Sequence, residues 1–138
     1  KVNMNLVTYV TAVSRQPKIY AVSIFHNTKT LENLQGSGRA ILQFLTTGHL
    51  NIARILGKRS GTTYDKEEYL RKKDLISEWK GLEVLSGCAA YISLNVHSVQ
   101  TTGDHDPYLF HVDSYETGLD YHSLLTVDHL RASRMISI

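Results

Sequence analysis

Two hydroxyls, an amide and an amine stand together where an apolar run gives way to a predicted helix. The run IYAVSI ends at Ile24, and Asn27, Thr28, Lys29 and Thr30 come shortly after it. The first backbone N–H groups of a helix lack partners and its dipole favours negative charge, so this position could hold an anion such as a phosphate. The competing interpretation is capping, because Asn27 or Thr28 is an ordinary N-cap residue worth about 1 kcal/mol. Taken alone, the stretch favours capping, although the two roles are compatible.

A second group of polar residues follows another predicted helix. In the stretch LGKRSG, Lys58, Arg59 and Ser60 lie between two glycines. Glycine permits a close backbone approach, and the three polar side chains could reach an anion. A solvated loop is the alternative, and the local sequence favours it.

Three titratable residues, Asp104, His105 and Asp106, stand side by side before a predicted strand. Because successive strand residues point to opposite faces, His105 should face away from its two neighbours. It could face a ligand or it could stabilise the turn, and the sequence leaves both roles open. No metal site is expected, because the other histidines are scattered and metal ligands need suitable spacing.

The sequence shows no motif in which the protein itself supplies a reactive group. It lacks GxSxG, HExxH, CxxC and a paired-carboxylate motif. Cys88 lies in the apolar stretch GCAAYISL, which is typical of a small buried side chain rather than of a nucleophile. If the protein is an enzyme, a bound cofactor would therefore supply the chemistry.

Length and composition narrow the class of protein. The chain has 138 residues, 42% hydrophobic and 20% charged, which is a globular balance and predicts one domain over residues 1–138. The net charge is only +2 and no basic stripe appears, so nucleic-acid binding is not expected. No apolar run approaches the roughly 20 residues of a membrane span, and no signal peptide is visible. The single cysteine fits a reducing compartment, so a cytoplasmic location is expected.

The elements that must position these residues are mostly strands. Stretches rich in Val and Thr, a run that is apolar on both faces (residues 18–25) and alternating apolar residues (residues 105–115) are typical of strands. Strands are predicted over residues 4–14, 18–25, 39–45, 80–85, 87–97 and 105–115. Helical spacing predicts helices over residues 30–38, 49–58, 62–76 and 124–135. This order lacks the regular alternation of a parallel α/β sheet. The predicted fold class is therefore mainly β, an antiparallel β-barrel or sandwich with helical insertions.

Taken in this order, the segments resemble the flavin reductase-like family, the FMN-binding split barrels. The resemblance rests on PKIYAVSIFHNTKTLENLQGSGRAILQFL, LGKRSGTTYDKEEYL, GDHDPYLFHV with its GDH motif, and LLTVDHLRASRMISI. It implies a six-stranded antiparallel split barrel with helices, usually a homodimer, that binds FMN or less often FAD near the dimer interface. The family normally has another strand before Lys1, and this sequence starts there without a methionine. We therefore expect an N-terminal strand to be missing.

The resemblance also implies which residues bind the flavin. The hydroxyl pair Thr28 and Thr30 would hold the phosphate, with Asn27 and Lys29 beside it. His105 of the GDH motif would stand on the flavin and substrate side as the candidate catalytic residue. The flavin ring would lie along the segment that precedes TAVS, which contributes Asn3, Asn5, Leu6, Val7 and Thr8.

Two positions depart from the family pattern. The family often has a basic residue where Phe25 stands, so the phosphate could also rely on His26, Lys29 or the loop residues Lys58, Arg59 and Ser60. Leu6 replaces a small hydroxyl residue found early in the ring-binding segment, whereas Thr8 keeps a hydroxyl at the later position.

The activity that the resemblance implies is NAD(P)H-dependent flavin reduction, with hydride passing from the nicotinamide to the flavin and a partner oxygenase as a possible consumer. A flavin carrier or electron-transfer protein of the same fold is the alternative, and the sequence does not separate the two. A cofactor-free barrel that grips nucleic acid is a third hypothesis. The weak basicity and the lack of an aromatic and basic surface pattern argue against it.

Overall fold

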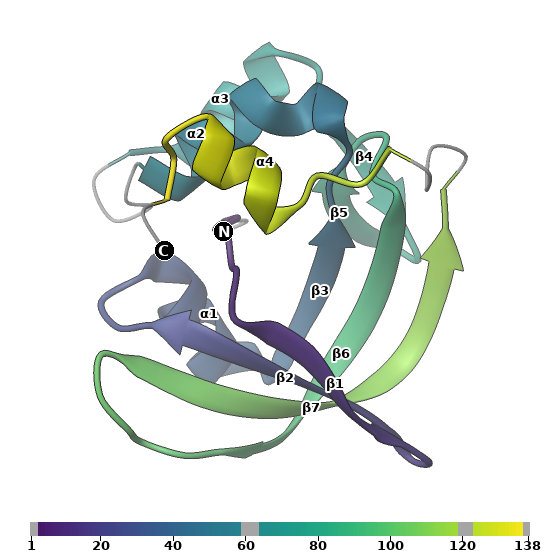
Figure 1. Cartoon of the computed structure of the whole chain (residues 1–138). Coiled ribbons are helices and arrows are strands. Elements are labelled where there is room, and N and C mark those ends of the chain that lie inside the picture. The colour runs from purple at the N-terminus through teal and green to yellow at the C-terminus, as the bar shows by residue number, and fades with distance from the viewer. Residues whose placement is uncertain (1–2, 59–63, 119–122, 137–138) are drawn as a thin grey trace.

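The centre of the protein is a curled sheet of five antiparallel strands in the order β1-β2-β7-β6-β3 (Figure 1). The computed structural model describes residues 3–58, 64–118 and 123–136. A separate hairpin pairs β4 (Ile76–Trp79) with β5 (Leu82–Leu85). The mainly β, antiparallel fold class expected from the sequence is confirmed. The strands of the curled sheet are β1 (Val10–Arg15), β2 (Lys18–Phe25), β3 (Arg39–Phe44), β6 (Ala90–Val99) and β7 (His105–Thr117).

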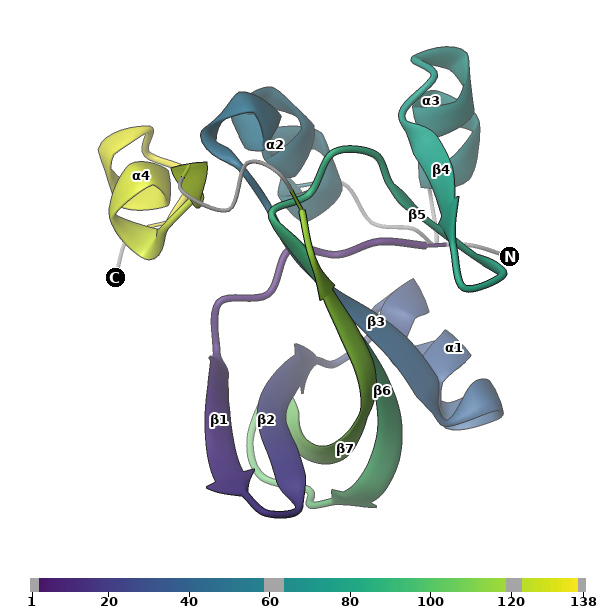
Figure 2. The ribbon, with the colours of Figure 1, turned by 90° about the vertical axis from the view of Figure 1, so that its right-hand side faces the viewer.

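The helices lie at one end of the sheet and along its side. They are α1 (Lys29–Ser37), the short 3-10 helix η1 (Thr47–His49), α2 (Leu50–Lys58), α3 (Lys66–Lys72) and α4 (Val127–Ala132). Figures 1 and 2 show α2, α3 and α4 gathered at one end, with α1 beside the sheet. Among the described helices, none combines the length and the apolarity that crossing a membrane requires.

The sheet curls strongly but is not closed by the described strands. The pairing of β6 with β7 shifts register twice, between Ser93 and Leu94 and between Val96 and Ser98. Such irregularities bend the strands and increase their twist, and Figure 2 shows the resulting curl. The strand order leaves β1 and β3 at the two edges, so the curled sheet has an open side between them.

The main hydrophobic core fills the concave face of this sheet. Strand residues two apart point to the same face, which places Val22 with Ile24 and Tyr108 with Phe110 in the interior. Helix α1 covers one side because Leu31 and Leu34 lie on one helical face and are both buried. These two leucines thereby hold α1 against the sheet.

A second core lies beneath α2 and α3. It consists of Met4, Leu56, Leu70, Leu85 and Cys88, all of them buried. Burial raises the pKa of the Cys88 thiol to about 11, which agrees with the expected role as a small buried side chain. Met4 brings the start of the chain into this core.

The strand predicted over residues 4–14 begins only at Val10. Just before β1, one more backbone hydrogen bond joins the chain to β2, from the Ser23 amide to the Tyr9 carbonyl. Residues 3–9, here called the N-terminal segment, have no regular secondary structure and run between the curled sheet and the helices above it (Figures 1 and 2). The apolar pattern of this segment reflects burial of Met4 and contacts around it rather than strand pairing.

The helix predicted over residues 62–76 is shorter than expected. In the described part it spans Lys66–Lys72, and Asp74 with a φ of 54° ends it. The strand predicted over residues 80–85 starts two residues later, as β5, which is one arm of the hairpin. Lys80 and Gly81, with φ values of 52° and 77°, form the tight turn before it. Ile76–Trp79, part of which was predicted as helix, is the other arm.

Candidate functional site

Thr28 caps the first turn of α1. Its backbone is extended, its Oγ1 accepts a hydrogen bond from the Leu31 amide at 3.1 Å, and the same hydroxyl donates to the Phe25 carbonyl at 3.0 Å. Asn27 adopts a left-handed conformation with φ of 60° and is exposed. The capping interpretation is therefore confirmed for Thr28, while Asn27 makes the turn that leads into the helix.

The two other polar residues at this helix start point to different partners. Lys29 Nζ forms an ion pair with Glu32 at 2.9 Å, one helical turn along. Thr30 Oγ1 instead accepts a hydrogen bond of 2.9 Å from Nδ2 of Asn3 in the N-terminal segment. Thr30 is thus the member of the predicted hydroxyl pair that connects the helix to the other predicted site residues.

A pocket of about 430 Å³ lies at the open side of the curled sheet. The N-terminal segment forms one side of it and β3 the other, with core side chains such as Phe110 and Leu94 at its base. The predicted ring-binding residues Asn3, Asn5, Leu6, Val7 and Thr8 all line this pocket, and so does Thr30. The structure therefore brings together two groups of predicted site residues that are far apart in the sequence.

The polar residues of this pocket include three that sequence reasoning did not single out. They are Asn33, Arg39 and Gln43. Gln43 is a polar residue in an otherwise apolar strand, and Arg39 is a cation directly after a helix stop, so both carried a local signal. Gln43 Oε1 accepts a 2.7 Å hydrogen bond from the Leu85 amide, which ties β3 to β5.

A second hollow of about 310 Å³ adjoins the first along β3. Both hollows are bordered by Asn3, Met4, Ala40 and Gln43, among others, and by Arg39. Arg39 is exposed, and among the described residues that line the two hollows it is the one cation, so it could contact an anionic group where they adjoin.

Lys66 anchors the N-terminal segment from the side of the helices. Its Nζ donates to the Met4 carbonyl at 3.0 Å, to Asn5 Oδ1 at 2.8 Å and to the Leu56 carbonyl at 2.8 Å. The residue is 2% exposed, and burial lowers the pKa of its amine to about 8. In the sequence it is one lysine within a charged stretch, so nothing local distinguished it.

Gly57 of α2 allows Leu6 to approach the helix closely. A Cβ added at Gly57 would lie 3.2 Å from the Leu6 Cβ. Together with the contacts to Thr30 and Lys66, this packing connects the N-terminal segment to α1, α2 and α3.

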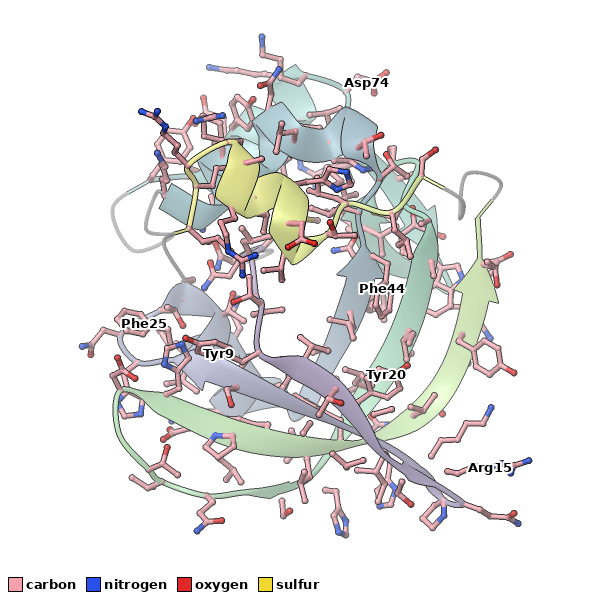
Figure 3. The ribbon with its side chains drawn as sticks, viewed as in Figure 1. Tyr9, Arg15, Tyr20, Phe25, Phe44 and Asp74 are labelled. Atoms are coloured by element: carbon pink, nitrogen blue, oxygen red, sulfur yellow. The ribbon has the colours of Figure 1, made fainter. Side chains whose placement is uncertain are left out.

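His105 is the first residue of β7 and does not line the pocket; its ring lies in an aromatic group. Its ring centroid is 5.1 Å from those of Tyr9 and Phe25, which are 49% and 52% exposed. Figure 3 shows Tyr9 and Phe25 next to each other near the start of α1. His105 Nδ1 is 2.8 Å from Asp104 Oδ1, and this hydrogen bond lowers the pKa of the Asp104 carboxyl. The prediction that His105 faces away from both neighbours is therefore wrong for Asp104, because this contact turns the ring towards it. The turn-stabilising contact is present, and a role towards a ligand stays a prediction.

Of the predicted loop residues Lys58, Arg59 and Ser60, only Lys58 lies within the described residues. Lys58 is exposed at the end of α2 and does not line the pocket. Arg59 and Ser60 lie outside the described residues. Within the described ranges, no three His, Cys, Asp or Glu side chains are grouped so that they could hold a metal ion.

Comparison with known families and structures adds independent evidence on this arrangement. A family model described as "Flavin reductase like domain" matches residues 2–132, almost the whole chain. No curated protein matches the sequence.

Several solved structures have the same fold. The FMN-binding protein from Thermus thermophilus superposes with a TM-score of 0.74 at 26% identity, over 83% of this chain and 63% of that chain. Flavoredoxin from Methanosarcina acetivorans gives 0.73 at 14% identity, over 83% and 61% of the two chains. The styrene monooxygenase flavin reductase from Pseudomonas putida S12 gives 0.66 at 23% identity, over 80% and 68%. This chain therefore spans about three fifths of the length of the first two structures.

Proposed function

Because the chain belongs to the flavin reductase-like domain family, we propose that it binds FMN in the pocket at the open side of the sheet and acts as an NAD(P)H-dependent flavin reductase. The observation that carries the proposal is the convergence of the N-terminal segment and Thr30 on one pocket. Binding of FAD in place of FMN, a homodimer, a cytoplasmic location and supply of reduced flavin to a partner oxygenase belong to the same proposal.

The residues of the pocket suit a flavin. Apolar side chains such as Val22, Leu94 and Phe110 would contact the faces of a flat aromatic ring system. The side-chain amides of Asn3 and Gln43 would offer hydrogen bonds to its polar edge. Thr30 and Arg39 would hold the phosphate, Thr30 through its hydroxyl and Arg39 through its charge.

In the proposed reaction the protein positions its ligands rather than reacting with them. Bound flavin would supply the redox chemistry by accepting a hydride from a reduced nicotinamide. The apolar base of the pocket would exclude water from the reacting face, and the N-terminal segment would fix the orientation of the ring. His105 would border the nicotinamide, because its neighbour Tyr9 directly follows the pocket residue Thr8.

The first experiment is a visible absorption spectrum of the purified protein followed by titration with FMN. The proposal expects a yellow protein or saturable uptake of FMN, and consumption of NADH or NADPH that depends on FMN. Failure of the protein to bind FMN at micromolar concentrations would refute the proposed site.

A flavin carrier or electron-transfer protein is the second candidate function. The 26% identity to a protein that is named for FMN binding alone, without a reductase activity in its name, supports it. Such a protein would bind FMN with the same residues but turn over negligibly with either nicotinamide. Steady-state rates with NADH and with NADPH, measured at saturating FMN, separate the two functions.

A further inference from the structure

The N-terminal segment forms one side of the pocket, and most of its hydrogen bonds run to helices, from Asn3 to Thr30 and from Lys66 to Met4 and Asn5, while Gln43 of β3 contacts the Met4 sulfur. Its last backbone bond to a neighbouring strand is at Tyr9, and residues 3–8 line the pocket without strand pairing. The position of this side of the pocket therefore depends on the groups that anchor the segment at its other end.

Lys66 makes two hydrogen bonds to the N-terminal segment. One amine reaches the backbone of Met4 and the side chain of Asn5, at 3.0 and 2.8 Å. The same amine reaches the carbonyl of Leu56 at 2.8 Å. Leu56 belongs to the last turn of α2, where carbonyls lack helical partners and the helix dipole favours a cation. Lys66 thus joins the segment to the end of α2.

Ordinary packing does not account for a lysine at this position. Burying a cation without a negative partner is unfavourable, and an apolar side chain would fill the space at less cost. Within the described chain, the partners of Lys66 are two carbonyls and an amide oxygen rather than a carboxylate. The neighbouring acids have other contacts: Asp65 caps α3 by accepting from the Glu68 amide, and the Glu67 and Glu68 carboxylates pair with Arg71 and Lys72. What the buried amine does provide is a fixed position for three acceptors.

We propose that Lys66 is a positioning residue of the flavin site, which holds the N-terminal segment against the end of α2 so that the segment forms a pre-ordered side of the pocket. This inference rests on the proposed function for the ligand, but the anchoring itself can be measured without flavin. Pre-ordering favours binding because the segment then loses little conformational freedom when the ligand arrives.

The anchoring is tested by the methyl resonances of the methionines. The chain has two methionines, Met4 in the N-terminal segment and Met135 after α4, so a protein labelled with 13C-methyl methionine gives two signals. In Lys66→Leu the Met4 signal is expected to move towards its position in unfolded chains, while the Met135 signal stays in place. The matched control is Lys72→Leu, which removes an exposed lysine from the same helix and should leave both signals unchanged.

The role in ligand binding is tested by FMN titration of the same variants. Lys66→Leu is expected to raise the Kd for FMN about tenfold relative to Lys72→Leu, the size of effect that loss of one charge-assisted hydrogen bond produces. At saturating FMN, the kcat and the KM for the nicotinamide should return to the values of the parent protein. A general loss of structure would not give this split. Should Lys66→Leu fail to fold, Lys66→Gln keeps two N–H donors and is expected to give the same changes, several-fold smaller.

Two results overturn the proposal. An unchanged Met4 signal in Lys66→Leu shows that the lysine does not anchor the segment, and equal FMN affinity in Lys66→Leu and Lys72→Leu shows that the anchoring does not serve the ligand. A parent protein that binds no FMN, combined with a displaced Met4 signal in Lys66→Leu, refutes the proposed function and leaves the anchoring supported.

Discussion

The two hydroxyls at the start of α1 lie two residues apart but do different work. Thr28 is engaged twice, by the Leu31 amide and the Phe25 carbonyl, and so belongs to the helix start itself. Thr30 accepts a hydrogen bond from Asn3, which also lines the pocket. The helix cap and the proposed ligand contact therefore belong to separate side chains, so mutation can test them separately.

Substitution of each hydroxyl should change a different property. Thr28→Ala is expected to lower the free energy of unfolding by about 1 kcal/mol and to leave the Kd for FMN unchanged, because it removes only a cap. Thr30→Ala is expected to weaken FMN binding with little loss of stability, since the residue lies within the first turn. Chemical denaturation and FMN titration of both variants provide the measurement, and unchanged affinity in both would contradict the role of Thr30.

The buried amine of Lys66 should also affect how stability varies with pH. Its pKa is lowered from the ordinary value of 10.5 to about 8 by burial. Between these two values the unfolded chain binds the proton and the folded protein does not, so stability should rise as pH rises through this window. Relative to Lys66→Leu, the free energy of unfolding of the parent is expected to increase from pH 8 to 10.5, by at most about 3 kcal/mol.

The surroundings of Lys66 support this sign. Residues 3–8 carry no titratable side chain, and α2 carries only the cations Arg54 and Lys58. On α3, Glu67 and Glu68 pair with other residues. Unfolding measured in urea at several pH values checks the prediction, which would be contradicted by a difference between parent and variant that falls towards pH 10.5.

Among the elements, α2 contacts the N-terminal segment directly, because Gly57 lets Leu6 approach the helix closely. In Gly57→Ala the new methyl would meet Leu6 at 3.2 Å. Leu6 cannot retreat easily, since Asn3 and Asn5 on its N-terminal side are held by Thr30 and Lys66. We therefore expect this variant to weaken FMN binding several-fold and to show none of the usual gain of up to about 1 kcal/mol for replacing a helical glycine.

Gly36 of α1 is the matched control for this prediction. A Cβ added there meets nothing within 4 Å. Gly36→Ala should therefore raise the free energy of unfolding by about 0.5–1 kcal/mol and leave FMN affinity unchanged. Thermal unfolding and FMN titration of the two variants decide the comparison, and equal stabilisation in both would show that Leu6 can move.

Elements that pack against the main core were predictable, whereas those ordered by distant contacts were not. The apolar run of residues 18–25 and the alternating pattern of residues 105–115 match β2 and β7, because the inward residues of both strands fill that core. The N-terminal segment has an apolar pattern like that of a strand, but the residues that bury Met4, such as Leu56 and Leu85, are distant in the sequence. The hairpin arm Ile76–Trp79 was hidden for a similar reason, since its partner strand rather than its own pattern fixes its conformation.

The same distinction applies to the site. The family resemblance predicted that Thr30 and residues 3–8 serve one site, and the structure places them around one pocket, while their contact with a flavin stays a prediction. Lys66 was not predictable, because its role depends on contacts across the fold. For Lys66 the partners are 61 and 62 residues away in the N-terminal segment.

For the molecule as a whole, the open side of the curled sheet is the feature that matters most. The pocket there is continuous with the main core, because Val22, Ile24, Leu34, Leu94 and Phe110 belong to both. Because these five residues are nearly fully buried in the folded protein, a ligand that enters the pocket would contact an interior that exists only in the native state. Ligand binding and global stability should therefore be coupled.

This coupling gives a prediction for the whole protein. FMN at a concentration of one hundred times its Kd should raise the free energy of unfolding by about 2.7 kcal/mol. For a chain of this size that corresponds to an increase in Tm of roughly 5–15 °C. Differential scanning calorimetry with and without FMN provides the measurement. Riboflavin, which lacks the phosphate, is the control and should raise the Tm less at equal concentration, while an unchanged Tm with FMN would contradict binding to the native state.

The anchoring of the N-terminal segment by Lys66 also has a consequence for the order in which the protein acquires its structure. Residues 3–9 leave the ribosome about 60 residues before Lys66 does, and the contacts between them span 61 and 62 positions. Contacts of such long sequence separation form late, after the elements between them have been made. During synthesis, the earliest part of the chain described here would thus be among the last to reach its final place.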